Sequence, residues 1–188
     1  MRNILTVLLL SAAAVAPAQA AISIVGTGLG RECFLAAELK RDTRTGLDIC
    51  GRALDETSLN RRDRAATLVN RGILQMYDRN MTLALRDFDQ AIALEPNLAE
   101  AHVNRGIALL RKGGQDQAAI DALSKGLSMN PEKPEVAYYT RAVAYEIVGN
   151  VKGAYDDYMA AAAARPDWTE PQEQLKRFSV ERRKSGQG

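Results

Sequence analysis

One pattern of residues recurs three times between residues 65 and 168, and it limits the fold more than any other feature. Small residues stand 35 positions apart, at Ala84, Ala119 and Ala154. Prolines keep the same step, at Pro96, Pro131 and Pro166. A short motif precedes them as Asn70-Arg71-Gly72, Asn104-Arg105-Gly106 and Thr140-Arg141-Ala142. A period of this length is typical of an array of stacked structural units.

Each copy contains two segments with helical periodicity, and a proline ends the second segment. Aromatic residues make up only 5% of the chain, whereas Ala, Leu and Arg are frequent, which favours helices over strands. The expected helices are 65–77 and 83–94, then 99–111 and 117–129, then 135–148 and 152–164. Small residues midway along the first helix and early in the second would let the two helices approach closely. Larger residues would fill the space one turn later, at Phe88, Leu123 and Tyr158.

The period, the small residues, the large residue and the terminal proline together resemble tetratricopeptide repeats (TPR). The resemblance covers about residues 65–168 and implies an all-α, right-handed solenoid of three helix–turn–helix hairpins, at 65–98, 99–134 and 135–168. Gly126 stands where the family usually has Ala, so we expect the second helix of that copy to be weakened by up to ~1 kcal/mol.

A solenoid needs caps, because each repeat exposes an apolar face to its neighbour. We expect an N-terminal capping hairpin over residues 31–64, with helices at 32–41 and 47–54, a turn at 43–46 and a polar connection at 59–64. A capping helix is expected over 169–184, with Thr169 as its N-cap, and a tail over 185–188. Leu175 and Phe178 would then cover the last hairpin, with Trp168 packed beneath them.

The first twenty residues have the form of a signal peptide, with a basic start, a short apolar run and a cleavage site after Ala20. Residues 21–30 would form a flexible linker. An uncleaved membrane anchor is the alternative, whereas the mature chain has no other long apolar run and is not expected to enter a membrane. Export to the periplasm or out of the cell favours a disulfide between Cys33 and Cys50, the alternative being two buried thiols.

Composition gives no support for nucleic-acid binding, a metal site or a cofactor. The formal net charge is +2, and one His with two Cys cannot supply a zinc site. The GxGxG run at 26–30 lacks the spacing and context of a phosphate loop, and His102 lacks a catalytic or metal-ligating partner. We therefore expect no enzyme.

An arginine precedes the mid-helix small residue in every copy. Intra-hairpin ion pairs with a structural role are expected between Arg71 and Asp87 and between Arg141 and Asp157. In the second copy Ala122 stands at the place of the aspartate, so Arg105 would need Asp121 or another partner.

The resemblance implies that function lies in a concave groove, which the first helices line and in which a peptide segment of a partner lies. Asparagines would bind the peptide backbone and apolar residues its side chains. The residues expected to face the groove are Val69, Asn70, Ile73, Tyr77, Val103, Asn104, Ile107, Arg111, Tyr139, Thr140, Val143 and Glu146. Chaperone-docking members of the family use a lysine-containing carboxylate clamp, and Val69 and Ile73 stand where its lysines would be. The expected function is that of an exported adaptor or assembly factor. A self-associating structural protein, and hence a homo-oligomer, is the alternative.

Overall fold

The computed structural model describes residues 28–40, 42–55 and 59–178, and within these ranges all regular structure is helical. The helices are α1 (Leu29–Leu39), α2 (Thr43–Asp55), α3 (Arg61–Tyr77), α4 (Met81–Leu94), α5 (Ala99–Lys112), α6 (Asp116–Leu127), α7 (Pro134–Ile147), α8 (Val151–Ala164) and α9 (Glu170–Leu175).

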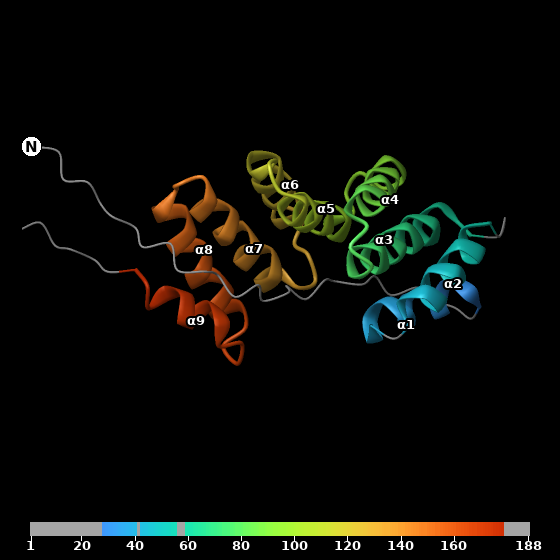
Figure 1. Cartoon of the computed structure of the whole chain (residues 1–188), viewed down its shortest axis with the longest axis horizontal. Coiled ribbons are helices and arrows are strands. Elements are labelled where there is room, and N and C mark those ends of the chain that lie inside the picture. Colours follow the sequence, from blue (N-terminus) through green and yellow to red (C-terminus); the bar gives the residue numbers. More distant parts are fainter. Residues whose placement is uncertain (1–27, 41, 56–58, 179–188) are drawn as a thin grey trace, which may run out of the picture.

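Consecutive helices pack as antiparallel pairs, and the pairs stack side by side into an arc (Figure 1). Helices α3, α5 and α7 line the inner side of the arc, and α4, α6 and α8 lie on its outer side. Helices α1 and α9 occupy its two ends. The expected all-α solenoid of hairpins is confirmed.

Close approach within each hairpin depends on the repeated small residues. A Cβ atom added to Gly72 would lie 2.5 Å from Cε1 of Phe88, and one added to Gly106 would lie 2.6 Å from Cγ of Leu123. Phe88 and Leu123 are fully buried. The glycine on the inner helix thus receives the large side chain of the outer helix, as the sequence pattern predicts.

The N-terminal hairpin repeats this design with one change. Gly46, Cys50 and Ala53 have the spacing of Ala84, Phe88 and Ala91, and all of them are buried. Cys50 therefore takes the place of the large side chain. It forms a disulfide with Cys33 of α1, with an S–S distance of 2.01 Å and a Cα–Cα distance of 4.8 Å. The disulfide joins the two helices at the point where the other hairpins place a small and a large residue in contact.

Several expected boundaries in the N-terminal region differ from the structure. The predicted turn at 43–46 is helical, because the Asp42 carboxylate accepts hydrogen bonds from the amide and hydroxyl of Thr45 and starts α2 there. Residues 61–64 are also helical, because the Asn60 side chain accepts a hydrogen bond from the Asp63 amide and caps α3. At the end of the predicted linker, Leu29 and Gly30 already belong to α1.

The C-terminal cap is shorter than expected. Helix α9 ends at Leu175, and Thr169 lies at its N-cap position without a side-chain capping bond. Trp168 is nevertheless buried against Tyr139, with ring centroids 4.8 Å apart, and Phe178 packs on the outer helix α8. The short helix and the residues beside it thus cover the last hairpin as predicted, although α9 has only six residues.

Four expectations fall wholly or partly on residues outside the described ranges: the signal peptide at 1–20, the linker over 21–27, the last part of the capping helix at 179–184 and the tail at 185–188. In the part of the chain that the structure describes, no helix has the length and apolar character needed to cross a membrane.

Candidate functional site: the inner face of the arc

Most of the side chains expected to contact a peptide are packed inside the array. Eight of the twelve have at most 6% of their surface exposed: Val69, Asn70, Ile73, Val103, Asn104, Ile107, Tyr139 and Thr140. Tyr77, Val143 and Glu146 are partly buried, and Arg111 is exposed. A peptide on the surface could reach only these last four without displacing a neighbouring helix.

The buried polar members of this set bond within the protein. The Asn104 side-chain amide donates to the Glu100 carbonyl at 2.9 Å, and the Thr140 hydroxyl donates to the Val136 carbonyl at 2.8 Å. Tyr139 lies between Tyr158 and Trp168, with ring centroids 5.4 and 4.8 Å away. The role of these residues is therefore packing between helices, which corrects the expectation that asparagines would hold a peptide backbone.

The accessible positions of the inner face can be found by counting from the repeated small residue of each inner helix. The residue five positions after the small residue lies about 140° around the helix from it, on the side turned away from the outer helix. In α3 and α5 these residues are Tyr77 and Arg111. In α1, counted from Cys33, it is Glu38, and in α7 it is Ile147, whose exposed fraction is 57%.

By this count the position in α7 is Ile147, whereas the sequence interpretation named its neighbour Glu146. In the structure Glu146 belongs to the packing of the C-terminal cap, because Arg177 donates a hydrogen bond to its Oε2 atom at 2.8 Å. Burial raises the pKa of the neighbouring Tyr158, and Glu146 adds to the increase.

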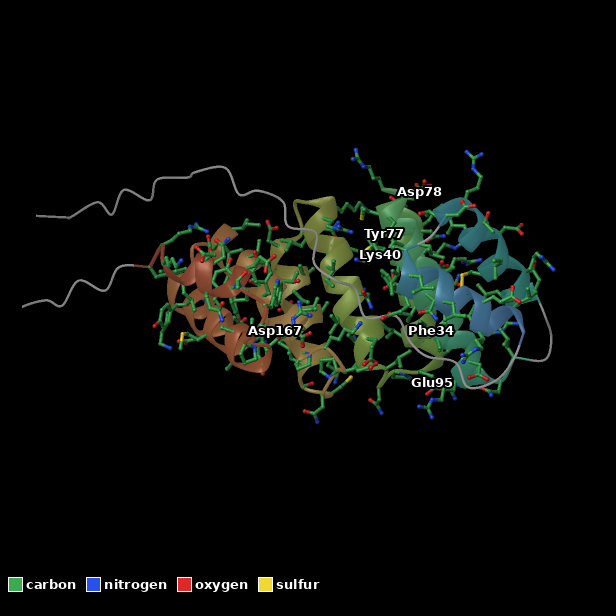
Figure 2. All side chains as sticks on the ribbon, turned by 90° about the horizontal axis from the view of Figure 1, so that it is seen from below. Phe34, Lys40, Tyr77, Asp78, Glu95 and Asp167 are labelled. Carbon is green, nitrogen blue, oxygen red and sulfur yellow. A yellow bond between two sulfur atoms is a disulfide. The ribbon has the colours of Figure 1, made fainter. Side chains whose placement is uncertain are left out.

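Charged groups from α1, α5 and the segment before α7 surround Tyr77 of α3, and we name Glu38, Lys40, Tyr77, Arg111 and Lys133 the Tyr77 cluster. The Lys40 ammonium lies over the Tyr77 ring, 5.5 Å from its centroid (Figure 2). Lys133, in the segment before α7, places its Nζ atom 3.5 Å from Oε1 of Glu38 on α1. This ion pair joins residues 95 positions apart and connects the N-terminal hairpin to the entrance of the third repeat.

Burial and two charged groups of the cluster determine the direction in which the pKa of Tyr77 shifts. Burial, with a smaller contribution from Glu38, raises the pKa of Tyr77 to about 12, and Arg111 acts in the opposite direction. Burial also lowers the pKa of Arg111, and Tyr77 is the group that partly offsets this effect. Among the described residues, no carboxylate lies within ion-pairing distance of Arg111.

The arginines of the repeated motif form ion pairs that hold the hairpins together. Arg71 donates two hydrogen bonds to the buried Asp87 carboxylate, at 2.8 and 2.7 Å. Arg141 binds Asp157 in the same two-pronged way, at 2.7 and 2.8 Å. These hydrogen bonds raise the pKa of both arginines. The predicted pairs thus have the expected geometry within their hairpins.

In the second copy, where Ala122 replaces the aspartate, the arginine pairs with a carboxylate of another repeat. Arg105 donates to Asp89 of the preceding outer helix, α4, at 2.7 Å, whereas Asp121 accepts from Gln117. The ion pair of this copy therefore links two repeats. Arg141 also makes such a link, through a hydrogen bond to Ser124 of α6 at 2.9 Å.

Two shallow surface hollows lie elsewhere on the solenoid. One, of about 210 Å³, is apolar and lies on the N-terminal hairpin between Leu35, Leu39 and Ile49. The other, of about 450 Å³, lies on the outer helix α4 and extends from Leu85 to Lys112. In the described ranges, no group of three or more His, Cys, Asp and Glu side chains could hold a metal ion.

No family model matches the sequence. Among solved structures, the chain is similar to MamA, with 21% identity and a TM-score of 0.65 over 80% of this chain and 82% of that one. It is also similar to the TPR domain of OM64 from Arabidopsis, with 21% identity and a TM-score of 0.57 over 62% of this chain and 98% of that one. YrrB, a TPR protein with an unusual peptide-binding site, matches with 20% identity and a TM-score of 0.62 over 78% of this chain and 74% of that one. The hairpin array with its small–large contacts, together with these likenesses, shows that the chain has the tetratricopeptide-repeat fold.

Proposed function

We propose that this protein is an exported interaction module that binds a polypeptide segment of a partner on the inner face of its arc, as an adaptor or assembly factor. The observation that carries the proposal is the Tyr77 cluster, which brings accessible polar groups from four elements to one place on that face. The likeness in fold to YrrB, with its peptide-binding site, supports a peptide as the ligand.

The chemistry of the cluster suits binding. A tyrosine whose pKa is raised keeps its proton at neutral pH, so the Tyr77 hydroxyl is a hydrogen-bond donor and a poor general base. Arg111 offers several donors in a fixed planar geometry. Such groups fix the register of a segment, while Ile147 and the partly buried Val143 offer apolar contacts further along the face.

Export is the second part of the proposal. The disulfide between Cys33 and Cys50 supports it, because structural disulfides persist in oxidising compartments. N-terminal sequencing of the protein isolated from the periplasm or the medium tests this part. We expect Ala21 as the first residue. A full-length chain that stays with the membrane would contradict cleavage, and a chain found only in the cytoplasm would contradict export.

Site-specific photo-crosslinking in the producing cell tests the binding part. A photoreactive amino acid replaces Tyr77 on the inner face, and the matched control places it at Leu83, an exposed residue of the outer helix α4. We expect a partner protein to be crosslinked from position 77 and not from position 83. Equal crosslinking from both positions would contradict a binding site on the inner face.

Self-association is a second candidate, and the exposed apolar residues on the outer helix of the third repeat favour it. Val151 and Met159 of α8 have exposed fractions of 51% and 48%, and Ile147 and Val148 lie beside the start of that helix. Light scattering on the secreted protein separates the two candidates, because self-association predicts a mass that rises with concentration. Crosslinks from position 77 to a second copy would favour it as well.

A further inference from the structure

We propose that the Tyr77 cluster selects an acidic segment of the partner polypeptide, whose carboxylates pair with Arg111 and compete with Glu38 for Lys133. The inference rests on the proposed function, because it assumes that a polypeptide lies on the inner face, and it adds the chemistry that the polypeptide must have.

The charge balance of the cluster is the first argument. It holds three cations, Lys40, Arg111 and Lys133, and a single carboxylate, Glu38. Glu38 is paired with Lys133, so the other two cations have no carboxylate within the cluster. A ligand that carries negative charge would complete these pairs, whereas a basic segment would meet like charges.

The second argument is the state of Arg111. Arg111 is exposed, and in the described part of the chain no carboxylate lies within ion-pairing distance of its guanidinium. The arginines of the repeated motif, Arg71, Arg105 and Arg141, each bind an aspartate, whereas Arg111 lies outside that motif. Arg111 is thus prepared for an external carboxylate, which a guanidinium can bind through two parallel hydrogen bonds.

The third argument is the position of the Glu38–Lys133 pair. The two side chains come from the N-terminal hairpin and from the entrance of the third repeat, and both keep part of their surface exposed, 40% and 31%. An exposed pair of this kind contributes little to stability and exchanges partners readily. A carboxylate of the partner can therefore take Lys133 from Glu38 at small cost.

The occupant that fits is an internal acidic stretch. The places where a carboxylate clamp would need lysines hold Val69 and Ile73, which are buried, so a free C-terminus has no clamp to enter. The cations of the cluster come from the ends of α1 and α5 and from the segment before α7, spread along the face, which suits several side-chain carboxylates in sequence. Tyr77 at their centre offers an aromatic surface to the aliphatic part of a glutamate.

Fluorescence anisotropy with defined peptides tests the inference on the oxidised, full-length mature protein. The probe is a labelled peptide of alternating Glu and Ala with an amidated C-terminus, and the matched probe has Gln in place of every Glu. We expect binding of the Glu peptide, weakening as salt is added, and at least tenfold weaker binding of the Gln peptide. Equal affinity for the two peptides would overturn the proposal.

Three variants locate the binding. Arg111→Gln should weaken binding of the Glu peptide about tenfold, because it removes a charge-assisted pair. Arg86→Gln removes the same charge from the outer helix α4 and should leave the affinity unchanged. Glu38→Gln should strengthen binding by about two- to threefold, since it releases Lys133. Circular dichroism would confirm the fold of each variant.

Equal losses for the Arg111 and Arg86 variants would refute a localised site. A single-stranded oligonucleotide serves as a rival polyanion, and binding of the oligonucleotide without the Glu peptide, with the same dependence on Arg111, would also refute the inference. If the Glu peptide does not bind but the photoreactive residue at position 77 still crosslinks a partner, the proposed interaction module is supported and its preference for acidic segments is refuted.

Discussion

Replacing Gly126 by Ala separates the effect of helix propensity from the effect of packing. In an exposed helix interior this change stabilises by about 1 kcal/mol. In α6, however, the added Cβ would lie 2.6 Å from Cγ2 of Val103 and 3.1 Å from both the Ala99 carbonyl oxygen and the Val103 amide nitrogen. Two of these atoms belong to the backbone of α5, so the helices must move apart.

The magnitude follows from the two opposing terms. Overpacking of a close helix contact costs about 1–3 kcal/mol, and propensity returns about 1 kcal/mol. We therefore expect Gly126→Ala to lower the free energy of unfolding by about 0–2 kcal/mol. The matched control is Gly51→Ala in α2, where no atom lies within 4 Å of the added Cβ and a gain of about 1 kcal/mol is expected.

Urea unfolding followed by circular dichroism, under oxidising conditions, measures both variants. The two changes in free energy should differ by about 1–3 kcal/mol, which is the packing cost itself. If Gly126→Ala stabilises as much as Gly51→Ala, the close approach of α5 and α6 does not limit the residue at this position. The reasoning about small residues in this solenoid would then be refuted.

Three further predictions concern single groups. Reduction of the Cys33–Cys50 disulfide, which closes a loop with a sequence separation of 17, should lower the unfolding free energy by about 3 kcal/mol; an unchanged urea midpoint after reduction would contradict this. Asp157→Ala leaves the largely buried Arg141 guanidinium without its carboxylate and should lower the free energy of unfolding by about 3 kcal/mol in urea unfolding. Asp156→Ala removes the neighbouring, exposed ion pair with Lys152 and should lower it by less than about 0.5 kcal/mol. Tyr77, whose pKa is raised to about 12, should stabilise the fold fully below the ordinary tyrosine pKa of about 10 and lose this contribution as the pH rises from about 10 to about 12. The difference in tyrosinate absorbance between the wild type and Tyr77→Phe should show a midpoint near pH 12, and a midpoint near 10 would contradict burial of the hydroxyl.

The fold was predictable because its determinants are local and repeated. Each hairpin is specified by a small residue, a large residue and a terminal proline within about 35 positions, and every copy gives the same answer. Gly126 shows the limit of this reasoning. The effect of an alanine at this position on stability depends on the distance between the backbones of α5 and α6, and helix propensity says nothing about that distance.

The site was predictable only in part, for a related reason. Helical periodicity tells which residues of α3 and α5 face inward, but it does not tell how far the neighbouring helices cover them. Asn70 and Asn104 therefore proved buried, while Tyr77 and Arg111 stayed accessible to different degrees. The pairing of Glu38 with Lys133 depends on the curvature of the whole array, which no local pattern encodes.

The disulfide makes local unfolding start more easily at one end of the array than at the other. In a solenoid the terminal repeats have one neighbour instead of two, so both ends fray before the middle. At the N-terminal end, the bond between Cys33 and Cys50 keeps α1 beside α2 even when their packing loosens. At the opposite end of the described residues the cap is α9, a helix of six residues without a disulfide. Under oxidising conditions, backbone amides should therefore exchange fastest at the C-terminal end and more slowly toward the middle. Reduction of the disulfide should make the amides of α1 exchange faster as well.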